Sequence, residues 1–357
     1  MKKILIIDDS ALMRRVMSDI INSEPGVYAA DTAENGKIAV ELLEGQKRYD
    51  LILLDINMPK MNGIRFLEFL NEAGYTIPTL VVSSIASKST EETIRALELG
   101  AYDFVKKPEG MFGVSGGDFK EQLLMKVKCA FQVKNVSYPK PQKEAKKMEL
   151  VPGTDRSGRP GRSRGGKGTI IFIASSTGGP KALQSVIPKF PKDIGCPIVV
   201  VQHMPAGFTG SLAERLNEMS QCRVVEASDG AVLENGVIYV AKGGYQLSVA
   251  RTGISEHTLA VRKDPARNGL RPCADIFLES LLDSGYEKVF CAVLTGMGSD
   301  GTKGLIQLKK MKDVYTVGQS ESTCVVYGMP RAAAKEGVVD DVADLEDVAG
   351  LLMKKVM

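Results

Sequence analysis

The chain of 357 residues has no tryptophan and only two histidines, His203 and His257. Any chemistry that needs an imidazole therefore has only two candidate positions. No run approaches the roughly 20 consecutive apolar residues of a membrane-spanning helix, and residues 1–3 lead straight into a strand-like segment rather than a signal peptide. These absences predict a soluble, cytoplasmic protein.

The cysteines also lack any metal-binding or disulfide pattern. None of them shows CxxC spacing, and several lie in apolar runs, where a thiol packs as a small hydrophobic group. The sequence therefore predicts neither a metal centre nor a disulfide framework built on Cys129, Cys196, Cys222, Cys273, Cys291 and Cys324.

Positive charge is concentrated in one segment. Residues 134–167 contain ten Lys/Arg and three Asp/Glu, a local charge of +7, whereas the whole chain carries +3 and the rest therefore −4. Prolines, glycines and serines abound there, so the segment buries too little apolar surface to order itself. It predicts a flexible linker rather than a DNA-binding arm, because Tyr138 is its only aromatic residue for base stacking.

Strand-like and helix-like segments alternate on both sides of this linker. Helical spacing is clear at residues 12–21 and 276–282. This alternation predicts an α/β protein with two doubly wound parallel-sheet domains, one flavodoxin-like and one Rossmann-like. The expected domains are residues 1–125 and 168–357, and residues 126–167 form the end of a helix and the linker. The expected strands are 4–7, 51–54, 79–82, 104–105, 169–173, 197–201, 237–241, 289–294 and 313–317.

Three carboxylates converge in the first domain. Asp8 and Asp9 follow the first expected strand, and Asp55 follows the strand at 51–54. The carboxyl ends of parallel strands form a ligand-binding crevice, and clustered carboxylates favour a cation such as Mg²⁺. Ser83 and Lys107 end two further strands and bring a hydroxyl and an ammonium that suit phosphoryl oxygens.

The segments IIDDS, LLDINMP, LVVSS and VKKP resemble, in that order, the receiver domains of response regulators. The resemblance covers about residues 1–125. It implies that Asp55 accepts a phosphoryl group, that Asp8, Asp9 and Asp55 hold Mg²⁺, and that Ser83 and Lys107 sense the phosphoryl group.

Three strand ends in the second domain carry a different set of groups. The strand at 169–173 leads into Ser175 and Ser176, the next leads to His203, and the strand at 289–294 leads to Asp300. A hydroxyl, an imidazole and a carboxylate at one edge indicate a hydrolase. The serines lie outside a GxSxG motif, which disfavours an ordinary lipase or esterase, and spacing alone leaves either serine as the nucleophile.

The segments SSTGGPKAL, VVVQHMPAGFTGSLAERL, LTGMGSDGTKG and TCVVYGMPRAA resemble the catalytic domain of the chemotaxis protein-glutamate methylesterases, over about residues 168–355. The resemblance implies that Ser176 is the nucleophile, His203 the general base and Asp300 its orienting partner. It also implies an oxyanion hole formed by the backbone N–H groups of Thr177 and Met297. The family usually has Gly-Ala where this chain has Ala174-Ser175.

The same resemblance implies partners and control. The substrate would be methylated chemoreceptor cytoplasmic domains, with methanol released and some members also deamidating glutamine, and a chemotaxis histidine kinase would be the phosphodonor. Mg²⁺ would serve phosphoryl transfer in the receiver, with no cofactor for ester hydrolysis. We expect the unphosphorylated receiver to cover the hydrolase edge and phosphorylation of Asp55 to weaken that contact. Neither nucleic-acid binding nor membrane embedding is expected.

Two rival functions stay open from the residues alone. Gly296, Gly298 and Gly301 spell the GxGxxG of dinucleotide-binding domains, with Glu321 downstream, although this single short match leaves the serine and histidine segments unexplained. A transcription factor is the second rival, but the region after the linker is too long for a winged helix and has no basic recognition helix.

Three further residues have weaker assignments. His257 follows Glu256 in a polar stretch and is expected to be exposed and without a catalytic role. Arg267 and Arg271 flank a segment similar to one near the family's active site. They either bind an acidic receptor surface or are solvated charges.

Overall fold

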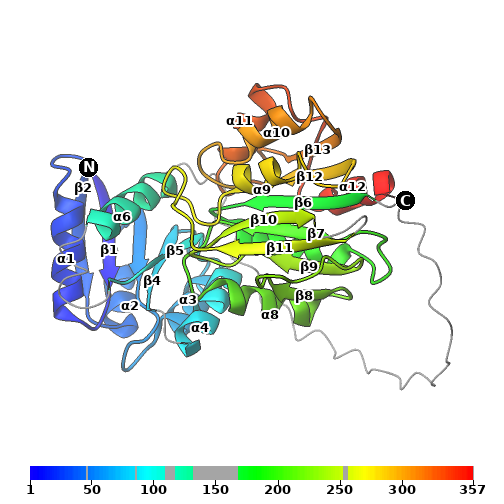
Figure 1. Ribbon diagram of the computed structural model, residues 1–357. Coiled ribbons are helices and arrows are strands. Elements are labelled where there is room, and N and C mark those ends of the chain that lie inside the picture. Colours follow the sequence, from blue (N-terminus) through cyan, green and yellow to red (C-terminus); the bar gives the residue numbers. More distant parts are fainter. Residues whose placement is uncertain (46, 85–86, 109–116, 132–167, 252–255, 357) are drawn as a thin grey trace, which may run out of the picture.

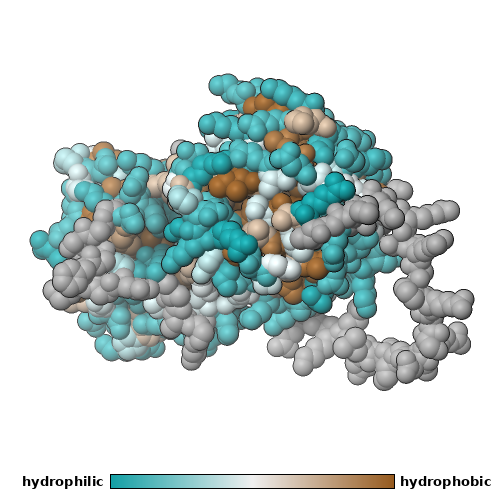
Figure 2. All heavy atoms as spheres, in the orientation of Figure 1, coloured by the Kyte–Doolittle hydropathy of each residue, from teal (hydrophilic) through white to brown (hydrophobic). Residues whose placement is uncertain are grey.

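The computed structural model describes residues 1–45, 47–84, 87–108, 117–131, 168–251 and 256–356. The predicted linker at 134–167 lies outside these residues. Two α/β domains lie side by side (Figure 1), one made of described residues up to 131 and one of described residues from 168 onward. Hydrophilic residues cover most of the face that Figure 2 shows, because the apolar strands are enclosed between helices.

The first domain is a five-stranded parallel sheet in the order β2-β1-β3-β4-β5. This is the flavodoxin-like strand order that the sequence predicts. Strand β3 is apolar and buried along its whole length, and β1 is apolar and buried from residue 4 to residue 7, as expected for a sheet covered on both faces. The strands are β1 Lys2–Ile7, β2 Tyr28–Ala33, β3 Leu51–Leu54, β4 Thr79–Ser83 and β5 Asp103–Lys106. The helices are α1 Ala11–Asn22, α2 Gly36–Glu44, α3 Gly63–Glu72, α4 Ser87–Glu98 and α6 Gly117–Ala130.

The register of β1 and β3 sets the first site. Ile7 pairs with Leu54, so Asp8 and Asp55 follow directly from paired residues. The Asp55 N–H donates to the Ile7 carbonyl at 2.8 Å, which extends this pairing beyond the end of β3. The two carboxylates are therefore neighbours at the carboxyl edge of the sheet.

The second domain is a seven-stranded sheet in the order β14-β13-β12-β6-β7-β9-β8, and every neighbouring pair is parallel. An antiparallel hairpin of β10 and β11 packs beside it. The strands are β6 Thr169–Ser175, β7 Ile198–Gln202, β8 Arg223–Glu226, β9 Val237–Val240, β10 Gln246–Arg251, β11 His257–Arg262, β12 Lys288–Val293, β13 Asp313–Gln319 and β14 Asp341–Ala343. The helices are α7 Gly179–Val186, η1 Ile187–Lys189, α8 Thr209–Met219, α9 Ala274–Ser280, α10 Thr302–Leu308, α11 Met329–Lys335 and α12 Val348–Val356.

Strand β6 lies in the middle of this sheet, between β12 and β7. Ser175 pairs with Gln202 of β7, and Ala174 pairs with Val293 of β12. The chain leaves all three strands at the same edge, so the segments after residues 175, 202 and 293 meet there. The order of strands also changes direction at β6, which is where open parallel sheets bind ligands.

The two domains contact each other through α4 and β5 on one side and α7 and α8 on the other (Figure 1). The rings of Phe104 and Phe208 are 4.5 Å apart at their centroids and both are buried. Glu98 accepts hydrogen bonds from Arg215 at 2.6 Å and from Gln184 at 3.2 Å. The interface therefore has an apolar centre and polar contacts beside it.

The structure departs from the sequence-based expectations in two respects. Strands β2, β8, β10, β11 and β14 are not among the predicted ones, because they are short or only half buried. The prediction that His257 is exposed is wrong: the side chain is buried in β11, stacks on Tyr286 and accepts a hydrogen bond from the Gly285 N–H at 3.0 Å. Burial and the nearby Arg251 lower the pKa of His257, so the ring is held neutral.

Candidate functional site

Ser175 and Ser176 differ sharply in their surroundings. Ser175 is the last residue of β6 and fully buried, and its hydroxyl donates to Gln202 Oε1 at 2.7 Å. Ser176 is partly exposed at the start of the following turn, and its side chain has no hydrogen-bond partner among the described residues. Of the two hydroxyls, that of Ser176 is therefore the one that is partly exposed and not held by another described residue.

His203 and Asp300 are in direct contact. His203 Nε2 lies 2.7 Å from Asp300 Oδ2, and the carboxylate is almost fully buried. Since Asp300 is ionised, Nε2 is the nitrogen that carries the proton and donates it. Nδ1 is then the nitrogen that remains to accept a proton. The backbone N–H of His203 donates to the Ser175 carbonyl at 3.0 Å, so the histidine is held next to the serine segment.

The Asp300 carboxylate receives three further donors from the start of α9. Ala274 N donates to Oδ2 at 2.6 Å, Asp275 N donates to Oδ1 at 3.1 Å, and Cys273 Sγ donates to Oδ1 at 3.0 Å. Burial alone would raise the pKa of Asp300, but the hydrogen bond and charge of His203, together with the Cys273 and Ala274 bonds, outweigh it and lower the pKa to about 2. The carboxylate is thus a fixed anion beside the imidazole.

Two backbone N–H groups near Ser176 are free of backbone partners among the described residues. They belong to Thr177, which follows Ser176, and to Met297, in the loop after β12. The two loops are joined, because Ser176 N donates to the Thr295 carbonyl and the Thr295 hydroxyl donates to the Thr177 carbonyl, both at 3.0 Å. Unpaired N–H groups at such a turn can stabilise a negative oxygen.

The glycines of the GxGxxG match have structural roles at this edge. A Cβ on Gly296 would lie 2.7 Å from Ser176 Cβ and 2.5 Å from Met329 Sδ, so only glycine allows the two loops to approach this closely. Gly298 and Gly301 have φ values of 85° and 90°, in the left-handed region that favours glycine. Close packing and turn geometry therefore account for the motif without a dinucleotide.

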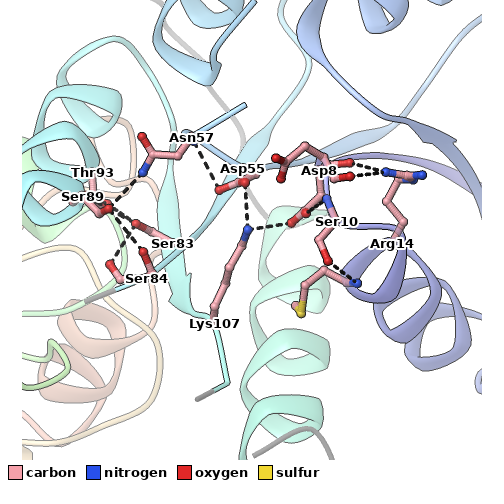
Figure 3. Close-up of polar contacts among 12 residues, drawn as sticks. Asp8, Ser10, Arg14, Asp55, Asn57, Ser83, Ser84, Ser89, Thr93 and Lys107 are labelled. Atoms are coloured by element: carbon pink, nitrogen blue, oxygen red, sulfur yellow. Dashed lines mark hydrogen bonds and ion pairs between the residues drawn. The ribbon is translucent and has the colours of Figure 1, made fainter. Parts of the chain in front are cut away.

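Figure 3 shows the acidic cluster of the first domain. Lys107 Nζ lies between two carboxylates, 2.8 Å from Asp8 Oδ2 and 2.8 Å from Asp55 Oδ2. Asp8, Asp9 and Asp55 each offer one oxygen, and these atoms all lie within 4.8 Å of one another. This all-oxygen donor set, two members of which are buried, fits Mg²⁺.

Charge and burial oppose each other in this cluster. Burial raises the pKa of Asp55, and the charge and hydrogen bond of Lys107 only partly offset the effect. Burial would lower the pKa of Lys107, but the charges of Asp55 and Asp8 outweigh it and raise the pKa. Ser83 does not contact Asp55: its hydroxyl accepts from Thr93 Oγ1 at 2.7 Å and lies on the side of α4 (Figure 3).

Family models match both domains of the chain. The CheB methylesterase family model matches residues 171–352, and the response regulator receiver domain model matches residues 4–112. The chain belongs to the CheB methylesterase family. A protein-glutamate methylesterase/protein-glutamine glutaminase of Bacillus subtilis is 41% identical over 98% of this chain and 97% of its own length. One from Pyrococcus horikoshii is 36% identical over 99% of this chain and 93% of its own length.

Solved structures of the family include the CheB methylesterase catalytic domain of Thermotoga maritima. It is 39% identical and superposes with a TM-score of 0.51 over 53% of this chain and 99% of that chain. The predicted fold class is therefore confirmed, and membership of the CheB methylesterase family excludes the dinucleotide-binding and transcription-factor alternatives. None of the helices in the described part of the chain combines the length and apolar character needed to span a bilayer.

Some contacts at the site are not predicted by the sequence. Gln202 and Cys273 contact the serine and aspartate segments, but a buried glutamine or cysteine has no sequence pattern that reveals its partner. For Gln202, its position directly before His203 is the available signal. Arg267 forms an ion pair with Glu279 at 2.7 Å, and Arg271 donates to the Asp264 carbonyl at 3.0 Å.

Proposed function

We propose that this chain is a phosphorylation-activated protein-glutamate methylesterase that hydrolyses glutamate methyl esters on the cytoplasmic domains of chemoreceptors during chemotactic adaptation. The observation that carries the proposal is the His203–Asp300 contact beside an unbonded Ser176 hydroxyl. Deamidation of receptor glutamines uses the same acyl chemistry, and the relatives' names include protein-glutamine glutaminase. We propose both activities for the one site.

In the proposed reaction, Ser176 Oγ attacks the ester carbonyl while His203 Nδ1 takes its proton. Asp300 stabilises the imidazolium through Nε2, and the N–H groups of Thr177 and Met297 stabilise the oxyanion. The imidazolium then protonates the departing methoxide, giving methanol and an acyl-enzyme. Water, deprotonated by His203, releases the glutamate and regenerates the Ser176 hydroxyl.

We further propose that residues 1–125 are the regulatory domain, that 126–167 end its last helix and link it to the enzyme, and that residues 168–357 carry catalysis. Asp55 is the proposed phosphoryl acceptor, with a chemotaxis histidine kinase as donor. Asp8, Asp9 and Asp55 would hold Mg²⁺, which neutralises phosphoryl charge when bound, and Lys107 would pair with the phosphoryl oxygens. Ser83 must turn from Thr93 to reach them.

In this proposal, the receiver domain controls the enzyme by blocking access of the substrate to the catalytic edge. Asp103 at the start of β5 accepts a hydrogen bond from Thr177 Oγ1 at 2.6 Å, and Cys129 Sγ lies 3.0 Å from Met297 Sδ. Both proposed oxyanion-hole residues are thus in contact with the receiver. Such contacts leave little room for a receptor helix at this edge, so phosphorylation must loosen them for hydrolysis to proceed.

The test is the release of methanol from methylated receptor membranes, with and without a small phosphodonor such as acetyl phosphate. We expect slow release that the phosphodonor accelerates, and none with Ser176→Ala. Release by Ser176→Ala at the parental rate, or none by the parental chain under either condition, is incompatible with the proposal.

A further inference from the structure

Gln202 is a buried polar residue that the reaction above does not use. It ends β7, directly before His203, and is 2% exposed. Each polar atom of its amide has a protein partner. Oε1 accepts from Ser175 Oγ at 2.7 Å, and Nε2 donates to the carbonyls of Ser176 at 2.9 Å and His203 at 3.0 Å. The amide therefore joins the proposed nucleophile segment to the proposed base segment.

The Ser176 carbonyl belongs to the same peptide unit as the Thr177 N–H. A trans peptide is planar, so its carbonyl and its N–H point in opposite directions. The Ser176 carbonyl accepts from Gln202 Nε2 and also from Gly179 N at 2.7 Å. Holding this oxygen with two donors fixes the direction of the Thr177 N–H, the group proposed to bind the oxyanion.

Ser175 fixes which way the Gln202 amide faces. Its hydroxyl is a donor to Oε1, whereas the opposite end of the amide faces two carbonyl oxygens. A flipped amide would place Oε1 against both carbonyls, which is repulsive in a buried site. Space for the amide comes from Gly179, where a Cβ would lie 1.9 Å from Gln202 Oε1.

We propose that Gln202, oriented by the Ser175 hydroxyl, is a positioning residue that aligns the Ser176–Thr177 peptide for oxyanion stabilisation. The inference rests on the proposed function of this site. A donor matters most where negative charge develops, so loss of alignment lowers kcat and leaves substrate binding unchanged. Removing an oxyanion donor outright costs about 10²- to 10³-fold in kcat. The substitution leaves the Thr177 N–H present but less well aligned, so kcat should fall less, by about tenfold to a hundredfold.

The experiment compares the full-length chain with Gln202→Met, Ser175→Ala and the double variant, all with phosphodonor. Methanol release from methylated receptors gives kcat and KM, and an alkyl boronic acid, which forms a tetrahedral adduct with a serine hydroxyl, measures oxyanion binding. Thr316→Val is the control for removing a buried polar group from the same sheet, since its hydroxyl is fully buried, lies away from this edge and has no hydrogen-bond partner among the described residues. Thermal unfolding establishes that each variant is folded.

We expect Gln202→Met to lower kcat with KM unchanged and to weaken boronic acid binding by the same factor. Ser175→Ala should lower kcat about fivefold, the equivalent of one ordinary hydrogen bond. The double variant should be no worse than Gln202→Met alone, because Ser175 acts through Gln202, and Thr316→Val should match the parent.

The inference is overturned by unchanged kcat in Gln202→Met, by a change confined to KM, or by additive losses in the double variant. If Gln202→Met does not fold, Ser175→Ala decides alone, and unchanged kcat there overturns the inference. Absence of methanol release from the unsubstituted chain contradicts the proposed function instead, so the two failures are distinguishable.

Discussion

Replacement of Asp300 by asparagine tests how the carboxylate controls the imidazole. Both carboxylate oxygens accept from backbone N–H groups, Oδ2 from Ala274 and Oδ1 from Asp275. The amide introduced by Asp300→Asn, in either orientation, therefore sets its NH₂ group against a backbone donor. Two hydrogen-bond donors then face each other in a buried place, and neither has an acceptor. This lowers the free energy of unfolding by about 1–3 kcal/mol.

The same change affects which ring nitrogen of His203 carries the proton. With its NH₂ at the Oδ2 position, the amide can only donate to Nε2, so the neutral ring carries its proton on Nδ1 and cannot accept one from Ser176. A wrong tautomer of this kind costs about 10⁴-fold in kcat in a serine protease. We expect Asp300→Asn to lower methanol release by about 10³- to 10⁴-fold while leaving KM close to the parental value.

The pH dependence of stability provides a second measurement on this variant. The pKa of Asp300 falls from its ordinary 3.8 to about 2 on folding, which corresponds to about 2 kcal/mol in favour of the folded state. Because the folded-state pKa is the lower one, this contribution is complete above about pH 4 and disappears as the pH falls to about 2. In denaturant unfolding experiments, the free energy of unfolding should fall more steeply with decreasing pH in the parent than in Asp300→Asn. Equal pH slopes, or kcat within tenfold of the parent, would refute this account of Asp300.

Three further predictions concern regulation and the second histidine. Deleting residues 1–134 should raise the rate on methylated receptors in the absence of phosphodonor; an unchanged or lower rate rules out inhibition by occlusion. Glu98→Gln removes the ion pair with Arg215 that joins the two domains, and it should raise the unphosphorylated rate about two- to fivefold, because a partly exposed ion pair contributes at most about 1 kcal/mol. Glu218→Gln removes the pair that Arg215 forms within α8 and should leave this rate unchanged. His257→Leu should leave Gly285 N without its acceptor and lower the free energy of unfolding by about 1–3 kcal/mol with kcat unchanged; a loss of kcat in a folded variant would show a catalytic role that the structure does not indicate.

Much of the fold could be predicted from the sequence because its central strands are unambiguous. Residues 51–54 and 170–174 are continuous apolar runs bounded by polar residues, which indicates buried parallel strands. Strand ends then bring Asp8, Asp55, His203 and Asp300 to their sites. Short strands such as Asp341–Ala343 and the half-buried β10 carry too little hydrophobic pattern to be distinguished from loops.

The errors and omissions at the site have a common physical cause. Local sequence does not reveal which distant segment covers a side chain, so the sequence predicts an exposed His257 although Tyr286 and Gly285 enclose it. Spacing likewise cannot separate Ser175 from Ser176, because the difference lies in a hydrogen bond to Gln202 on the neighbouring strand. The burial and hydrogen bonding of these side chains depend on contacts between distant segments, which a local sequence pattern does not encode.

The most direct test of the central claim is to locate the reactive serine chemically. The full-length chain, activated with phosphodonor, is treated with an alkyl fluorophosphonate, and the modified residue is identified by mass spectrometry of its peptides. We predict one adduct per chain on Ser176, none in Ser176→Ala, and a greatly slowed reaction in His203→Ala. An adduct on Ser175, or modification of Ser176 at an undiminished rate without His203, would contradict the proposed Ser176–His203–Asp300 site.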